Sequence, residues 1–216
     1  MTTLILVRHG QSTGNLKGLY CGQLDFPLSE QGFAQAELTG AYLKENYQID
    51  AIYSSDLCRA MKTAEPTAKA FGLEIIPERD LRETCVGEWE GKVTDEVIRK
   101  YAAEYELWRT NPDYAPKGGE SHSQTRERVW RCLEKILSKN EGKNVAVFAH
   151  VGTIGNIFCW CIPDAKTRNA MFSIDELHNA SVTVVRIENG RFVDCTMNGY
   201  VEHLAELATS TDPETV

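Results

Sequence analysis

Two arginines and two histidines follow apolar runs of the sequence, at points where buried strands are expected to end. Arg8 and His9 come directly after LILV, Arg59 follows AIYSS, and His150 ends NVAVFAH. Paired guanidinium groups favour a phosphate or a carboxylate, because their planar forks bind such groups through two parallel hydrogen bonds. An imidazole beside them can act as a nucleophile, an acid–base group or a metal ligand. These residue types therefore indicate an anion site with a reactive histidine.

Transfer of a phosphoryl group fits this set better than metal chemistry. Hard cations need several carboxylates, and zinc needs three or four His, Cys or Asp ligands without arginines crowding them. In a phosphoryl transfer, His9 would attack phosphorus while the two arginines and His150 neutralise the phosphate oxygens. Glu83 would give a proton to the leaving alkoxide, which requires a raised pKa, and would then act as the base for water. We therefore expect neither a metal nor a cofactor.

The order of the predicted elements explains how these residues could meet. Strands are expected at residues 4–9, 50–55, 73–78 and 144–150, followed by a hairpin over 181–197 with its turn at Asn189-Gly190. Helices are expected at 28–46 after an N-cap at Ser29, at 56–72 with a kink or a new start at Pro66, at 94–108, at 122–137 after Ser121, and at 152–161. The alternation predicts one α/β domain with a mostly parallel sheet, in which ligands bind at the carboxyl ends of the strands.

The buried side of the first long helix can also be predicted from its apolar residues. Their spacing within residues 28–46 is roughly helical, so that they are expected to share one face. The predicted face comprises Phe33, Ala36, Leu38, Tyr42 and Leu43.

Composition and charge narrow the possible classes of protein. The chain has 216 residues, of which 42% are hydrophobic and 25% are charged, and its net charge is −8, values typical of one globular domain. The sequence shows no basic stripe for nucleic acid, and the run LILV is too short for a signal peptide or a membrane span. Seven cysteines without a signal indicate reduced thiols and a cytoplasmic protein. For Cys159 and Cys161, buried thiols are favoured over a redox or metal pair.

Several ordered motifs carry a resemblance to a known family. They are RHGQSTGN from Arg8, GQLDFPLSEQG from Gly22, SSDLCRAMKTA from Ser54, LRETCVGEWEG from Leu81, GGES from Gly118 and FAHVGTI from Phe148. With these motifs, which span residues 4 to about 155, the chain resembles the histidine phosphatase superfamily, in the branch related to cofactor-dependent phosphoglycerate mutases. One departure concerns the second histidine, which glycine usually follows directly, whereas here Val151 precedes Gly152. A β-branched residue does not easily take a positive φ, so a family backbone that needs one would have to differ here.

The resemblance implies a fold, a site and a reaction. The fold would be a three-layer α/β/α structure with a mostly parallel central sheet and a small helical cap at about 86–117, in a single domain over 1–208 with a flexible tail at 209–216. The reaction would proceed through a phosphohistidine on His9, without a metal. Arg8, Arg59 and His150 would bind the phosphate, and Glu83 would donate the proton. Further residues that the resemblance places in the substrate pocket are Ser12, Asn15 and Gly152.

Hydrolysis of a small anionic phosphomonoester is the favoured activity, with two alternatives. True mutases of the family carry a long insertion between the acid and the GES motif, whereas only one predicted helix and a short loop separate Glu83 from Glu120. A small cap would leave water free to reach the phosphohistidine, although mutase activity remains an alternative. A non-catalytic phospho-ligand binder is the alternative from another class. Phosphosugars, phosphoserine, α-ribazole phosphate and aryl phosphates stay open as substrates, and the sequence indicates no oligomeric state.

More than one role is open to the cap residues and to His122. His122 follows GGES and could face the substrate or be structural, His178 is expected to form structural hydrogen bonds, and His203 is expected at the surface. The cap residues could cover an apolar or ring-shaped alcohol, or pack as an ordinary helix. They are Val86, Trp89, Tyr101, Tyr105, Trp108 and Tyr114.

Overall fold

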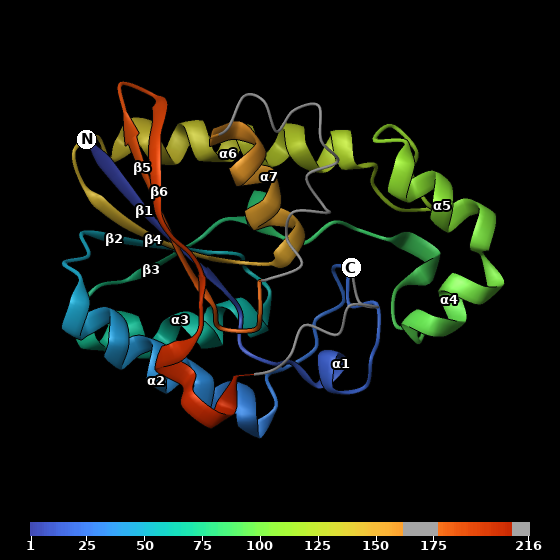
Figure 1. Ribbon diagram of the computed structural model, residues 1–216, viewed down its shortest axis with the longest axis horizontal. Helices are drawn as coiled ribbons and strands as arrows, with labels where there is room; N and C mark the ends of the chain where they lie inside the picture. The colour runs from blue at the N-terminus through green and yellow to red at the C-terminus, as the bar shows by residue number, and fades with distance from the viewer. Residues whose placement is uncertain (162–176, 209–216) are drawn as a thin grey trace.

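The computed structural model describes residues 1–161 and 177–208, except for the side chains of 159–161. A six-stranded sheet in the order β3-β2-β4-β1-β5-β6 forms its centre (Figure 1). The strands β1 to β4 are parallel to one another. The strand β5 is antiparallel to β1, and β6 is antiparallel to β5. The strands are β1 (Thr2–Arg8), β2 (Ala51–Ser54), β3 (Ile75–Pro77), β4 (Asn144–Ala149), β5 (Val182–Glu188) and β6 (Arg191–Tyr200). The predicted mostly parallel α/β fold is confirmed.

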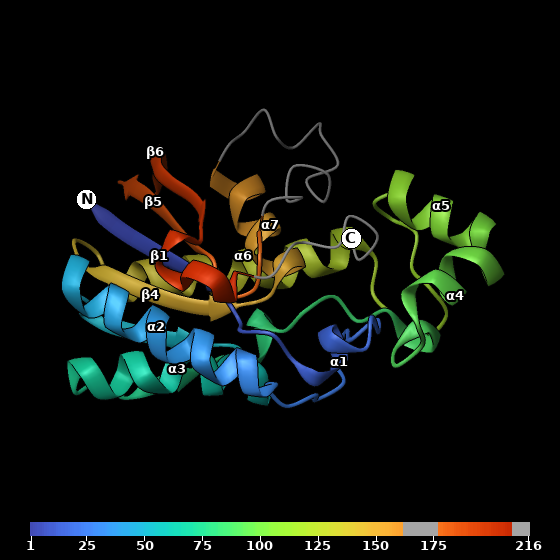
Figure 2. The same cartoon turned by 60° about the horizontal axis from the view of Figure 1, so that its bottom comes forward.

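Helices lie on both sides of this sheet and make the outer layers. The pair α2 and α3 covers one face and the pair α6 and α7 the other, while α4 and α5 lie beyond the carboxyl ends of the parallel strands (Figures 1 and 2). The helices are α1 (Thr13–Leu16), α2 (Glu30–Asn46), α3 (Cys58–Phe71), α4 (Thr94–Lys100), α5 (Ala102–Thr110), α6 (His122–Lys139) and α7 (Val151–Cys161). Short 3₁₀ helices lie at Arg79–Leu81, Gly87–Trp89 and Glu202–Leu207.

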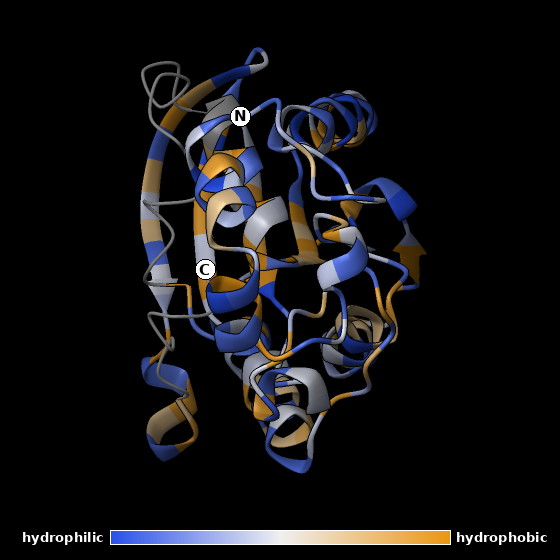
Figure 3. Cartoon of the chain, turned by 90° about the vertical axis from the view of Figure 1, so that its right-hand side faces the viewer, coloured by the Kyte–Doolittle hydropathy of each residue, from blue (hydrophilic) through white to orange (hydrophobic). Residues whose placement is uncertain are grey.

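The first strand is apolar on both sides because helices cover both faces of the sheet. Leu4 and Leu6 pack with α6 and α7, whereas Ile5 and Val7 pack with α2 and α3. All four side chains are fully buried. Seen from the cap side, the central strands are mostly hydrophobic (Figure 3). A continuous apolar run is what a buried parallel strand requires, and it places Arg8 and His9 where the strand leaves the core.

The helix α2 begins after Ser29, as predicted, and the Ser29 hydroxyl accepts a hydrogen bond from Gly32 N. The predicted apolar face is wrong for Phe33 and Leu38, which are 48% and 38% exposed. Small and polar residues are buried instead, because α2 lies very close to α3: a Cβ on Gly40 would stand only 2.8 Å from Pro66 Cβ. The buried residues are Gly32, Gln35, Ala36, Thr39, Gly40 and Leu43.

Other element boundaries also differ from the sequence-based expectations. The helix α3 runs without interruption through Pro66 to Phe71 and is capped by Gly72, which has a φ of 67°. The single helix expected at 94–108 is two helices, because Tyr101 leaves the helical conformation at φ −117° and ψ 34°. The hairpin turn is confirmed: Asn189 and Gly190 have φ values of 50° and 70°, as a type I′ turn requires.

Some expectations concern residues that the structure does not describe. The tail expected at 209–216 and the side chains of Cys159 and Cys161 lie outside the described residues. Within the described part of the chain, no helix has the length and apolar character needed to cross a membrane.

Candidate active site

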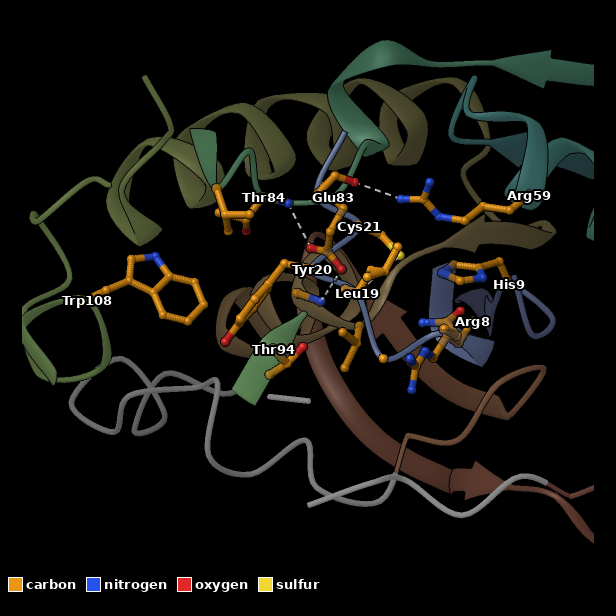
Figure 4. A pocket seen from close by; sticks show the side chains of 16 residues that line it. Arg8, His9, Leu19, Tyr20, Cys21, Arg59, Glu83, Thr84, Thr94 and Trp108 are labelled. Carbon is orange, nitrogen blue, oxygen red and sulfur yellow. Dashed lines mark hydrogen bonds between the residues drawn. The ribbon is translucent and has the colours of Figure 1, made fainter. Parts of the chain in front are cut away.

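A cavity opens at the carboxyl ends of β1 and β4, between the sheet and the cap. It is lined by Arg8, His9, Arg59 and Glu83, and also by Tyr20, Val86, Thr94 and Trp108. Figure 4 shows Arg8, His9 and Arg59 on one side of the Glu83 carboxyl and Tyr20, Thr94 and Trp108 on the other. Three segments far apart in the sequence thus deliver the predicted arginines, nucleophile and acid to one place.

The turn after β1 holds the His9 side chain in one tautomer. His9 Nδ1 lies 2.7 Å from the Gly10 carbonyl oxygen, to which only a protonated nitrogen can donate. The Nε2 lone pair is therefore free for attack. The backbone can turn tightly here because residue 10 is glycine: a Cβ would lie 2.6 Å from the Gly32 carbonyl oxygen. Gly10 N also donates to the Thr63 hydroxyl of α3, at 2.9 Å.

Burial keeps this imidazole neutral. Only 4% of His9 is exposed. The loss of hydration lowers the pKa of His9 well below its usual value, and the positive charges of Arg59 and Arg8 lower it further. A neutral imidazole is the nucleophilic form, so that His9 is ready for attack at neutral pH.

His150 lies behind the nucleophile rather than on the cavity wall. Its ring centroid is 5.1 Å from that of His9, and its Nε2 lies 2.8 Å from the Ser55 hydroxyl oxygen. The residue is fully buried, and burial, followed by the charge of Arg59, lowers the pKa of His150 well below the usual value. Ser55 was not predicted as a site residue, although it stands in the same motif as Arg59.

Backbone carbonyl groups hold both arginines, of which Arg59 is fully buried and Arg8 is partly buried. Arg59 donates from Nη1 to Leu24 O at 2.7 Å and from Nη2 to Gly22 O at 2.8 Å, and Arg8 donates from Nη1 to Leu177 O. Within the described residues, neither guanidinium forms an ion pair, and both Nε atoms are buried without a partner. Burial lowers the pKa of Arg8 to about 10. Buried cations without a carboxylate partner favour an anionic ligand.

The Glu83 carboxylate is fixed by two backbone amides. Oε1 accepts from Thr84 N at 2.8 Å, and Oε2 accepts from Gly152 N at 3.1 Å. Residue 152 must be small, since a Cβ there would stand 2.3 Å from Glu83 Oε1. Gly152 thus lines the cavity and also positions the acid through its amide.

Ser12 and Asn15 were both expected in the substrate pocket, but only Asn15 lines the cavity. Ser12 is fully buried and caps α1: its hydroxyl oxygen accepts from Asn15 N at 3.1 Å, and the hydroxyl donates to Asn15 Oδ1 at 2.8 Å. Asn179, which was not predicted, donates from Nδ2 to His9 O at 3.1 Å and ties this turn to the segment before β5.

A profile of the histidine phosphatase superfamily, branch 1, matches residues 4–198. The chain belongs to this superfamily. It is 35% identical over 199 residues to phosphoserine phosphatase 1 of Hydrogenobacter thermophilus, covering 92% of each chain, and 35% identical over 196 residues to a metal-independent phosphoserine phosphatase of Arabidopsis thaliana, covering 89% and 79%. The structure of a mycobacterial glucosyl-3-phosphoglycerate phosphatase complexed with VO3 is similar at a TM-score of 0.81 and 27% identity, covering 92% and 99%. The predicted family and the predicted class, a metal-independent phosphomonoester hydrolase, are confirmed.

In this histidine phosphatase, Val151 is compatible with the loop after the second histidine. Val151 is the first residue of α7 and is not among the residues with positive φ. A β-branched residue at this place therefore needs no left-handed conformation. Its side chain lines the cavity beside Gly152.

The other histidines of the phosphatase lie outside the cavity. His122 is 2% exposed and packs against Trp108, with ring centroids 4.4 Å apart and ring planes tilted by 42°, so that its role is structural. His203, expected at the surface, is half-buried: its ring stacks on both Tyr42 and Tyr200, and its Nε2 lies 3.1 Å from the Thr39 hydroxyl oxygen. His178 accepts a hydrogen bond from Ser181 N through its carbonyl group.

Most of the cap aromatic side chains form a small core of their own. Trp89, Tyr105 and Trp108 are buried together with Tyr20 and Val97. Of the six cap residues considered from the sequence, only Val86 and Trp108 line the cavity. Tyr20, which precedes the cap in the sequence, lines it as well and was not predicted. Ordinary packing therefore accounts for most of the cap aromatics.

Proposed function

We propose that this histidine phosphatase hydrolyses small anionic phosphomonoesters through a phosphohistidine on His9. One observation carries the proposal: the buried His9 ring has its Nδ1 2.7 Å from the Gly10 carbonyl oxygen, and the charges of Arg59 and Arg8 add to burial in lowering its pKa. The substrate phosphate would bind between Arg8 and Arg59, which stabilise the charge on its equatorial oxygens. His150 lies behind His9 and does not line the cavity, so it is assigned no contact with the phosphate.

Two steps complete the proposed reaction. In the first, the Nε2 lone pair of His9 forms the N–P bond as the P–O bond to the alcohol breaks, and protonated Glu83 gives its proton to the leaving oxygen. In the second, water attacks phosphorus, the Glu83 carboxylate takes its proton, and the N–P bond breaks to release phosphate. Each step leaves Glu83 in the form that the next step needs.

The uncharged residues that line the cavity support a substrate whose alcohol is uncharged. These lining residues include Leu19, Tyr20, Val86, Thr94 and Trp108. Such a wall favours an apolar or ring-shaped group, because burial of a second carboxylate without a cation is unfavourable. We therefore expect aryl phosphates to be better substrates than phosphoserine or 3-phosphoglycerate. The cytoplasmic location and the single domain over residues 1–208 with a cap at 86–117 stay predictions.

A phosphatase screen tests the proposal. Wild type, His9→Ala and the control His203→Gln are assayed in EDTA with aryl, sugar and amino-acid phosphates. We expect phosphate release by wild type and by the control, and a loss of at least about a thousandfold in His9→Ala. Wild type denatured in alkaline detergent during turnover should carry a phosphoryl group that is stable in base and lost in acid, and that His9→Ala lacks.

Three results would contradict parts of this proposal. Near-wild-type turnover by His9→Ala would remove the nucleophile. Isomerisation of 3-phosphoglycerate with bisphosphoglycerate present, without release of phosphate, would favour the mutase. Binding of phosphate without any turnover would favour the non-catalytic binder.

A further inference from the structure

A buried guanidinium lies directly behind the proposed acid. Arg128, in the second turn of α6, uses all five of its N–H groups. Nη1 donates to the carbonyl oxygens of Asp80 and Arg82, at 2.9 and 2.7 Å, and Nη2 donates to that of Glu83, at 2.8 Å. Nε and Nη2 also donate to the two carboxylate oxygens of Glu120, at 2.8 and 2.9 Å. The Arg128 side chain therefore fixes the backbone at Arg82 and Glu83 through hydrogen bonds.

Glu120 holds the other side of the same segment. Its Oε2 accepts from Cys85 N at 2.9 Å and from Gln23 Nε2 at 3.3 Å. Gln23 Nε2 also donates to Glu83 O at 3.1 Å. Burial alone would raise the pKa of Glu120, but the hydrogen bonds from Arg128 and Cys85 hold it below its usual value, so that the carboxylate is charged. The ion pair is well shielded, since the Arg128 side chain is only 11% exposed.

Neither member of the pair lines the cavity, so that both act on the substrate only through other residues. We infer that Arg128 and Glu120 are positioning residues: they fix the backbone of 80–85 so that the Glu83 carboxyl stays at the leaving oxygen. The inference rests on the proposed role of Glu83 as acid. It explains why an arginine is needed, because a lysine ammonium has three donors and no planar fork and cannot hold three carbonyls and a carboxylate together.

If Arg128 and Glu120 only supported the fold, their substitution would lower activity on every substrate equally. If they act through the acid Glu83, the loss of activity depends on the leaving group. p-Nitrophenolate leaves with little help from a proton, but an alkyl alkoxide needs one. The kcat/KM value is the correct measure, since it includes steps only up to departure of the alcohol and is independent of phosphohistidine hydrolysis. The ratio of kcat/KM between an alkyl phosphate and p-nitrophenyl phosphate therefore reports on the acid.

The variants are Arg128→Lys, Glu120→Gln and Glu83→Gln, with Arg82→Lys as the matched control. Arg82 is adjacent to Glu83 and also forms a two-bond pair, with Asp56 at 2.6 and 2.7 Å, but its guanidinium donates to no carbonyl of 80–85. We expect Arg128→Lys to lower kcat/KM on the alkyl phosphate about tenfold to a hundredfold and on p-nitrophenyl phosphate less than about threefold. Glu120→Gln should act in the same direction, and Arg82→Lys should leave the ratio unchanged.

The double variant separates this inference from the proposed function. In a Glu83→Gln background, Arg128→Lys should cause no further loss on the alkyl phosphate, because the acid through which it acts is already gone. Equal losses on both substrates in folded Arg128→Lys and Glu120→Gln, or additive losses in the double variant, would overturn the positioning role alone. If Glu83→Gln itself showed no preference between the substrates, the acid role would fall and the inference with it. Glu120→Gln keeps the shape of the side chain and serves as the test if Arg128→Lys does not fold.

Discussion

At the scale of single residues, the nucleophile depends on an environment that opposes its protonation. His9 is buried beside Arg59 and Arg8, and the buried cations make a third positive charge unfavourable. The same cations lower the energy of the phosphate that His9 attacks. One pair of guanidinium groups thus serves both partners of the reaction.

The protonation of His9 can be followed directly by NMR. Because burial lowers its pKa well below 6.5, the folded enzyme should keep His9 neutral as the pH is lowered from 8 to 6, with Nδ1 carrying the proton. We expect the ring signals of isotope-labelled His9, assigned with His9→Gln, to stay constant over this range. A midpoint near 6.5 would show that the ring is hydrated and that burial does not set its charge.

At the scale of elements, the packing of α2 against α3 depends on the absence of one side chain. Alanine is favoured over glycine in a helix by about 1 kcal/mol, so propensity predicts that Gly40→Ala is stabilising. The contact with Pro66 predicts the opposite, because overpacking costs about 1–3 kcal/mol. We expect a net loss in the free energy of unfolding, measured with denaturant. The exposed residue Ala41 provides the control. Ala41→Gly makes the reverse change where no neighbouring helix interferes, and it should be destabilising because of helix propensity alone. An increase in stability for Gly40→Ala would mean that the helices can separate easily.

The contact between α5 and α6 should make stability depend on pH. Burial lowers the pKa of His122 to about 4, whereas an unfolded chain has a value near 6.5. The unfolded state therefore binds the proton first, and stability falls as the pH drops from 6.5 towards 4. Between pH 7 and pH 4.5, His122 should contribute a loss of about 2 kcal/mol.

The matched variant for this prediction is His122→Phe, which keeps a ring against Trp108 but removes the titrating group. Unfolding by urea at pH 7 and pH 4.5 gives the loss of stability for each protein. Wild type should lose about 2 kcal/mol more than the variant over this interval. Equal losses would show that His122 is hydrated in the folded protein.

At the scale of the whole molecule, sequence patterns predict the individual strands and helices but miss contacts between segments that are far apart in the sequence. The apolar runs predict the strands, and the polar residues that follow them predict that Arg8, His9 and Glu83 meet at one edge of the sheet, where the structure places them. Arg128 was missed because its three carbonyl partners lie more than forty positions away and leave no pattern in the sequence. The buried face of α2 was mistaken for the same reason, since only the neighbouring α3 makes glycine and threonine the correct buried residues.

The pairing of β1 also determines when this strand can join a sheet during synthesis of the protein. Thr3 pairs with Asn144 of β4 and with Arg186 of β5. At ribosomal rates of about 5–20 residues per second, the first strand emerges on the order of ten seconds before its partners exist. During that time its apolar side chains lack a sheet and are available to chaperones or to other nascent chains. The segment that carries the nucleophile is therefore synthesised before the strands that complete its sheet, and catalytic competence arises only after β5 has been made.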